Sequence, residues 1–193
     1  MGLSIHYSGS FKRKVSLNAM IEEVKDIAEV FKWKHHVFEN EFPDSGFDSE
    51  EFNDKIYGIS FTPPECETVD LCFLSNGKMS SAANLMIWKN PENPEHKNYI
   101  YMLSTKTQFA GIEIHKSIIH LLKYITEKYF HEFNLMDEGN YWKTLDENIL
   151  KERFARYNFL LNMVEQAITT NQKNSDESFE NYFARILKDK GRE

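Results

Sequence analysis

Apolar residues at three- and four-residue spacing mark the helices of this chain and constrain its fold more than any other feature. Between residues 16 and 31 they fall on a single face, and Ser16 stands where it can cap the helix. A second such stretch follows Gly111, and a third follows Thr144 and Glu147, which have the spacing of a capping box. Each stripe has to be buried against another layer, so we expect these helices to pack on a sheet.

The strands of that sheet are indicated by alternation and by turn signals. Residues 3 to 7 alternate apolar and polar, residues 33 to 42 read as a second strand, and a short strand is expected at 133 to 139. Between 56 and 104, the runs "IYGISF", "VDLCFL", "ANLMIW" and "YIYML" predict an antiparallel meander of about four strands. The predicted fold class is α+β: a mainly antiparallel sheet, a helix after the first strand, and C-terminal helices packed on the sheet.

The chain has 193 residues, of which 41% are hydrophobic, enough for one sizeable core. Residues 1 to 168 are predicted to form a single α+β domain, and residues 169 to 177 a polar linker. Residues 178 to 193 carry the pattern of a short amphipathic helix, which is not stable alone. We therefore expect this helix to dock on the domain or on a second copy of the chain.

Charge and composition exclude several classes of partner. Thirty acidic residues against 23 basic ones give a net charge of -7, which repels nucleic acid. No apolar run is long enough to cross a membrane, and the N-terminus lacks the features of a signal peptide. Cys66 and Cys72 match no zinc or disulfide pattern, so a reducing, cytoplasmic location is expected.

A polar cluster at the start of the helix after Gly111 is the candidate ligand-binding site. Unpaired backbone N–H groups at a helix start can receive an anion. The competing interpretation is structural, with the same side chains serving only as caps and as satisfied buried hydrogen-bonding groups. The cluster comprises Thr105, Lys106, Thr107, Gln108 and His115.

Catalytic candidates come from histidines and carboxylates that could join this cluster. A histidine with a carboxylate is the minimum for general acid–base chemistry, and the candidates are His6, His115, Asp137 and Glu138. His115 and His120 are five residues apart and point to different sides of a helix, which excludes a zincin-type site. No metal site and no cofactor are predicted.

Several stretches of the chain resemble a family of uncharacterised bacterial proteins. These are "LSIHYSG" at 3 to 9, "YGISFTPPECE" at 57 to 67, "LCFLSNGK" at 71 to 78, "KTQFAGIEIHK" at 106 to 116 and "DEGNYW" at 137 to 142. The resemblance covers about residues 3 to 165. It implies a bacterial, cytosolic protein of one domain and carries over no activity, cofactor or site residue.

Two functions remain open from the sequence. The first is a binding protein that performs no chemistry and takes a protein or small-ligand partner. The second is a hydrolase-like enzyme that uses the His/carboxylate cluster, with or without a divalent metal. A homodimer is compatible with either and would be built on an apolar seam: Leu150, Phe154, Tyr157, Leu161, Val164 and Ile168.

Overall fold

The computed structural model describes residues 2–44, 47, 51–170, 177–182 and 185, and these form an α+β fold with two antiparallel sheets. One sheet has the order β5-β1-β6 and the other β2-β3-β4. The strands are β1 (Ser4–Phe11), β2 (Lys34–Val37), β3 (Tyr57–Thr62), β4 (Val69–Phe73), β5 (Leu103–Lys106) and β6 (Phe130–Asp137). The helices are α1 (Leu17–Val30), α2 (Ala82–Trp88), the 3-10 helix η2 (Pro94–Tyr101), α3 (Gly111–Tyr129), α4 (Tyr141–Thr144) and α5 (Glu147–Thr170). The predicted fold class is confirmed.

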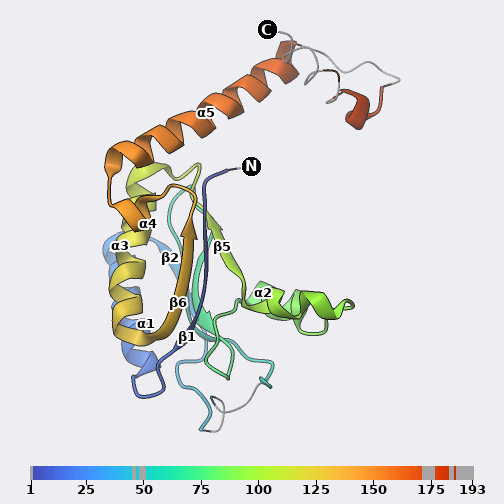
Figure 1. Cartoon of the computed structure of the whole chain (residues 1–193). Coiled ribbons are helices and arrows are strands. Elements are labelled where there is room, and N and C mark those ends of the chain that lie inside the picture. The colour runs from blue at the N-terminus through green and yellow to red at the C-terminus, as the bar shows by residue number, and fades with distance from the viewer. Residues whose placement is uncertain (1, 45–46, 48–50, 171–176, 183–184, 186–193) are drawn as a thin grey trace.

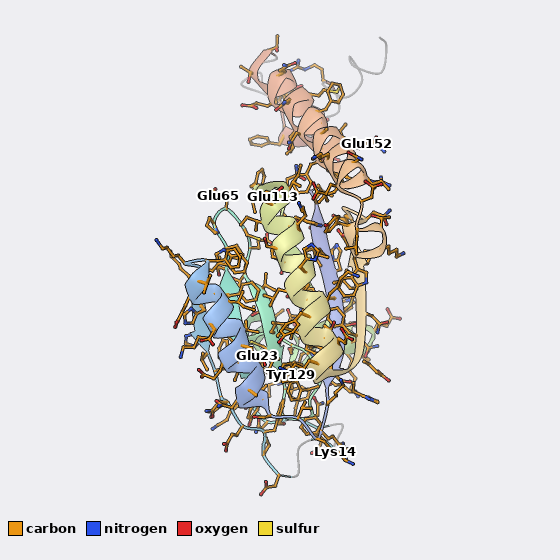
Figure 2. All side chains as sticks on the ribbon, turned by 90° about the vertical axis from the view of Figure 1, so that its left-hand side faces the viewer. Lys14, Glu23, Glu65, Glu113, Tyr129 and Glu152 are labelled. Carbon is orange, nitrogen blue, oxygen red and sulfur yellow. The ribbon has the colours of Figure 1, made fainter. Side chains whose placement is uncertain are left out.

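The two sheets are joined along β1. The amide of Met79 donates to the carbonyl of Gly9 at 2.9 Å, and the amide of Phe11 donates to the carbonyl of Gly77 at 2.8 Å. The segment after β4 therefore continues the β1 edge beyond the end of β5. Helices α1 and α3 lie side by side over the same side of the strands (Figures 1 and 2). A large apolar core lies between the helices and the strands.

The first and third predicted helices follow from their sequence patterns. Ser16 caps α1, because its Oγ accepts a hydrogen bond from the amide of Ala19 at 3.2 Å. Helix α3 buries Ile118, Leu122 and other apolar residues of its predicted stripe. The sequence also predicts His115 to be partly shielded at the rim of this stripe, whereas its side chain is fully buried.

Two of the four strands predicted between 56 and 104 are wrong. The run "ANLMIW" forms α2, because Ser81 caps it by accepting from the amide of Asn84 at 3.0 Å. Most of "YIYML" belongs to the end of η2, and β5 begins only at Leu103. Alternation of apolar residues over so short a run does not separate a strand from a helical turn.

The start of α5 also differs from the prediction. The hydroxyl of Thr144 donates to the carbonyl of Asn140 at 2.9 Å and so closes α4. Asp146 stands at the start of α5 instead, where its Oδ1 accepts from the amide of Asn148 at 2.8 Å. The predicted capping box is therefore not formed, because the chain turns once more before the helix begins.

Helix α5 packs on the body only through its first turns and then projects away from it (Figure 1). Leu150 and Phe154 are buried, whereas Phe159 is 63% exposed. The helix runs through Thr170, so the predicted linker cannot begin at residue 169. Most of the linker and much of the 178–193 helix lie outside the described residues. Over the described part of the chain, no helix has the length and apolar character needed to cross a membrane.

Candidate functional site

A row of three buried polar side chains lies where β5, α3 and β6 meet. Thr107 follows β5, His115 lies in the first turns of α3, and Asp137 ends β6. The hydroxyl of Thr107 is 2.8 Å from His115 Nδ1, and His115 Nε2 is 3.1 Å from Asp137 Oδ1. The same hydroxyl donates to the carbonyl of Leu3 at 3.3 Å, so it links the start of the chain to the imidazole. The contact between Nε2 and Asp137 lies at ion-pair distance but does not meet the geometry of a hydrogen bond.

Asp137 is held by more than the imidazole. Its Oδ1 accepts from the amide of Gly139 at 2.7 Å, and its Oδ2 accepts from the amide of Trp142 at 2.8 Å. Burial acts to raise the pKa of this carboxyl, but the hydrogen bond and charge of His115, together with the two amides, outweigh it. The pKa of Asp137 therefore lies below its ordinary value.

The close fit around the row requires glycine at position 139. A Cβ atom there would lie 2.9 Å from His115 Nε2, 3.0 Å from Asp137 Oδ1 and 2.7 Å from Leu150 Cδ1. Phe154 closes the same space, with its ring centroid 5.7 Å from that of His115 in an edge-to-face arrangement. The row is thus enclosed by α5 and by the turn after β6.

The other residues of the predicted ligand cluster are used inside the fold. Thr105 is buried and its hydroxyl donates to the carbonyl of Thr68 at 3.0 Å. Gln108 accepts from the amide of Leu3 at 2.9 Å and donates to Asn158 Oδ1 at 2.9 Å. These two side chains therefore hold neighbouring segments of the chain together.

Lys106 takes part through its backbone and through an aromatic contact. Its amide donates to Glu67 Oε2 at 2.8 Å, and its Nζ lies 5.2 Å from the centroid of the Phe109 ring. Of the five residues in the predicted cluster, the structure brings Thr107 and His115 into direct contact. It places Thr105, Lys106 and Gln108 in separate hydrogen-bonding pairs.

His6 and His115 lie on opposite faces of the sheet. Asp137, which contacts His115, is opposite Ile5 in the register of β1 and β6, so these two side chains share the face covered by α3. His6 is the next residue along β1 and points the other way, where its Nε2 is 3.8 Å from Glu138 Oε1. The four catalytic candidates therefore form two separate pairs.

The Thr107–His115–Asp137 row has the order of hydroxyl, imidazole and carboxylate that activates a nucleophile. Such a row needs a substrate within hydrogen-bonding reach of the hydroxyl. Here the Thr107 residue and the His115 side chain are 0% exposed, and the Asp137 side chain is 1% exposed. This geometry fits a structural hydrogen-bond network, because no part of the row is open to solvent.

The structure also bears on metal ligation and on the reactivity of the two thiols. Among the described residues, no three His, Cys, Asp or Glu side chains are grouped so that they could hold a metal ion. Burial, followed by the charge of Glu67, raises the pKa of the Cys66 thiol to about 12. Cys72 is buried and its thiol pKa is also raised by burial, so both thiols stay protonated at neutral pH.

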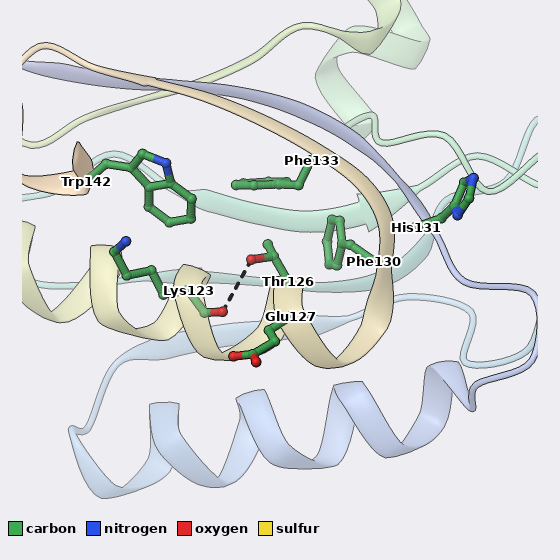
Figure 3. A pocket seen from close by; sticks show the side chains of 7 residues that line it. All are labelled: Lys123, Thr126, Glu127, Phe130, His131, Phe133 and Trp142. Atoms are coloured by element: carbon green, nitrogen blue, oxygen red, sulfur yellow. Dashed lines mark hydrogen bonds between the residues drawn. The ribbon is translucent and has the colours of Figure 1, made fainter.

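Two surface features of the structure were not predicted from the sequence. The first is a groove of about 480 Å³ between α3 and β6, lined among others by Lys123, Phe133 and Trp142 (Figure 3). The second is an arm, residues 82–102, which projects from the body (Figure 1) and exposes Met86 and Ile87. Reading "ANLMIW" as a strand hid the arm, although the Ser81-x-x-Asn84 cap before it was visible in the sequence.

Comparisons with protein-family models, with curated proteins and with solved structures find no match for this chain. The role of each feature therefore has to be inferred from its own geometry.

Proposed function

We propose that this protein binds a protein partner through the arm formed by residues 82–102 and performs no chemistry at the His115 row. The main observation that supports this proposal is the exposed apolar surface of the arm. Met86 is 80% exposed and Ile87 57%, and the adjoining part of the arm adds Tyr99 at 41% and Met102 at 62%. Exposed methionine and aromatic side chains are typical of protein-binding surfaces.

The arm is held in one conformation by its own hydrogen bonds. The side-chain amide of Asn84 donates to the carbonyls of Tyr99, Ile100 and Met102 at 3.4, 3.3 and 2.9 Å. The hydroxyl of Ser80 donates to the carbonyl of Ile100 at 2.7 Å. A surface that is already ordered loses less conformational entropy on binding, so these bonds favour the arm as a docking element.

Aromatic contacts stiffen the same arm. The ring of His96 stacks on that of Tyr99, with centroids 4.9 Å apart, and both rings contact Trp88 edge-on. These contacts fix η2 to the last residue of α2. The apolar side chains of the arm are thus carried by a rigid projection rather than by a loose loop.

The charge of the arm supports an apolar mode of binding. Its charged residues are Lys89, Lys97, Glu92 and Glu95, two of each sign, so its formal net charge is zero, whereas the whole chain carries -7. Long-range attraction therefore contributes little at the arm, and burial of apolar area has to supply the affinity. A protein surface with an apolar groove meets this requirement better than a nucleic acid or an anionic lipid does.

The enclosure of the His115 row supports binding rather than catalysis, because a substrate has no path to Thr107 in this conformation. We also propose a cytoplasmic location. The free thiols of Cys66 and Cys72 are compatible with a reducing compartment.

Site-specific photocrosslinking tests the proposed docking surface. A photoreactive phenylalanine analogue at Met86 of the full chain, in an extract of cells that make the protein, should crosslink one defined protein. The substitution Ile87→Glu should abolish that crosslink and leave the fold intact, because Ile87 is 57% exposed.

The matched control is the same analogue at Tyr124, which is 50% exposed on α3. We expect no crosslink to the same protein from that position. A partner that crosslinks equally from Tyr124, or that is still captured by the Ile87→Glu variant, would show that the arm is not the docking surface.

A further inference from the structure

Strand β6 is the open edge of its sheet. In the order β5-β1-β6 it pairs with β1 on one side only. Figure 2 looks onto α1 and α3, and β6 lies at the margin of the body on the side away from α1. The register with β1 shifts between Ser10 and Phe11, which leaves His131 as an extra residue on β6. The regular part of the edge therefore runs from residue 132 to 137.

The hydrogen-bonding pattern identifies which backbone groups of this edge face outward. The amide of Glu138 donates to the carbonyl of Ser4, its opposite residue, at 3.2 Å. In an antiparallel ladder alternate residues point to the same neighbour, so residues 132, 134 and 136 also bond to β1. The N–H and C=O groups of Phe133 and Leu135 then point away from β1, and no described group pairs with them.

The groove between α3 and β6 opens along this edge (Figure 3). The Nζ atom of Lys123 lies 4.3 Å from the centroid of the Trp142 ring at one end of the groove, and Glu127 also lines it. Neither Lys123 nor Glu127 forms a side-chain ion pair with another described residue. The edge thus combines unpaired backbone groups and aromatic surface with the charges of Lys123 and Glu127 in the groove, which have no ion-pair partner in the described part of the chain.

We propose that the occupant of this edge is a second copy of the chain, paired antiparallel through β6 about a two-fold axis at Asn134. This register places Phe133 opposite Leu135 of the second copy, and Leu135 opposite its Phe133. The outward N–H and C=O groups of these four residues then form hydrogen bonds with one another. Asn134 then meets its own equivalent. The β5-β1-β6 sheets of the two copies then form one continuous sheet of six strands.

Self-complementarity favours a second copy over an unrelated peptide. No like charges face each other in this register, because Glu132 is opposite Met136 of the second copy. Met136 is 61% exposed in the single chain and gains a neighbour. The two-fold axis reverses the direction of the groove, so the end that carries Lys123 faces the end that carries Glu127. A C2 interface of this kind uses the same surface twice.

Charge substitution at the axis tests this dimer. By sedimentation velocity over a wide range of protein concentrations, the wild-type chain should have twice the mass of one chain. Asn134→Lys and Asn134→Glu should each raise the dimer Kd by roughly tenfold or more, because like charges then face each other across the axis. An equimolar mixture of the two variants should form dimers again, which also shows that both variants are folded.

The matched control is Ser104→Lys, which adds the same charge at an exposed position of β5. This variant should remain dimeric. A monomeric wild-type chain, or an Asn134→Lys variant that dimerises as the wild type does, would overturn the proposal. A dimer that is lost on Phe159→Glu and kept in Asn134→Lys would overturn it as well and would place the contact on α5 instead.

Discussion

Removing the Asp137 carboxylate should destabilise the protein strongly without a change at its surface. In the substitution Asp137→Ala, three donors lose their partner: the buried imidazole of His115 loses the neighbouring carboxylate, and the part-buried amides of Gly139 and Trp142 lose their acceptor. A buried donor left without a partner costs about 1 to 3 kcal/mol. Since the three donors share one site and can rearrange together, we expect a total loss of about 3 to 5 kcal/mol, the range for breaking a buried charged pair.

Urea denaturation followed by circular dichroism measures this loss, and Glu138→Ala is the matched control. Glu138 is the next residue, bears the same group, and its Oε2 accepts from the amide of Ser4 at 2.7 Å. Its side chain is 31% exposed, against 1% for Asp137, so water can replace the lost acceptor. The expected cost for Glu138→Ala is about 1 kcal/mol or less. Equal losses for the two variants would refute the claim that burial makes the row structurally important.

The stability difference between the wild type and Asp137→Ala is also predicted to depend on pH. The pKa of Asp137 lies below its ordinary value in the folded protein, so the unfolded chain binds a proton at higher pH than the folded one does. The contribution of the carboxylate is therefore complete above the unfolded pKa and is lost as the pH falls through the folded pKa. The stability difference between wild type and Asp137→Ala should shrink in acid and be constant from weakly acidic to neutral pH.

Three further substitutions test separate parts of the structure. Gly139→Ala should cost about 1 to 3 kcal/mol, measured by urea denaturation, because the added Cβ would lie 2.7 Å from a Leu150 methyl carbon. Burial raises the pKa of Asp70 from 3.8 to about 6, so Asp70→Asn should raise the free energy of unfolding at pH 7 and leave it unchanged below about pH 3, where both states are protonated. Asn84→Ala should speed hydrogen exchange in residues 94–102, read by mass spectrometry, because the Met102 carbonyl loses its donor and the Tyr99 and Ile100 carbonyls each lose one of two donors.

The elements with long, regular periodicity could be predicted from the sequence, and the short ones could not. Helix α3 has enough turns for its apolar stripe to be unambiguous, and Ser16 marks the start of α1. In α2 only seven residues are helical, and the choice between strand and helix depends on the Ser81 cap and on packing against η2. Short apolar runs take their conformation from such tertiary contacts, which one sequence does not display.

For the candidate site, sequence reasoning named two residues that the structure brings into contact, but it could not say which candidates would be partners. His115 and Asp137 both stood among the catalytic candidates, but only strand register shows that Asp137 shares a face with Ile5 and that His6 does not. Register depends on pairing between segments more than a hundred residues apart, and a shift of one residue would exchange the faces. The open edge of β6 could not be predicted from the sequence either, because it depends on the order of the strands in the sheet.

The buried row has a mechanical consequence for the edge of β6, which is proposed to pair with a second copy. Thr107 holds the start of the chain, because its amide donates to the carbonyl of Leu3 at 2.9 Å. Asp137 fixes the end of β6 and the turn before α4. Both ends of β6 are therefore anchored, one by α3 and the other by the row, while the edge between them stays unpaired. An edge strand anchored at both ends can pair with a second copy without reordering. The polar groups of the row therefore hold β6 in the geometry that the proposed association requires.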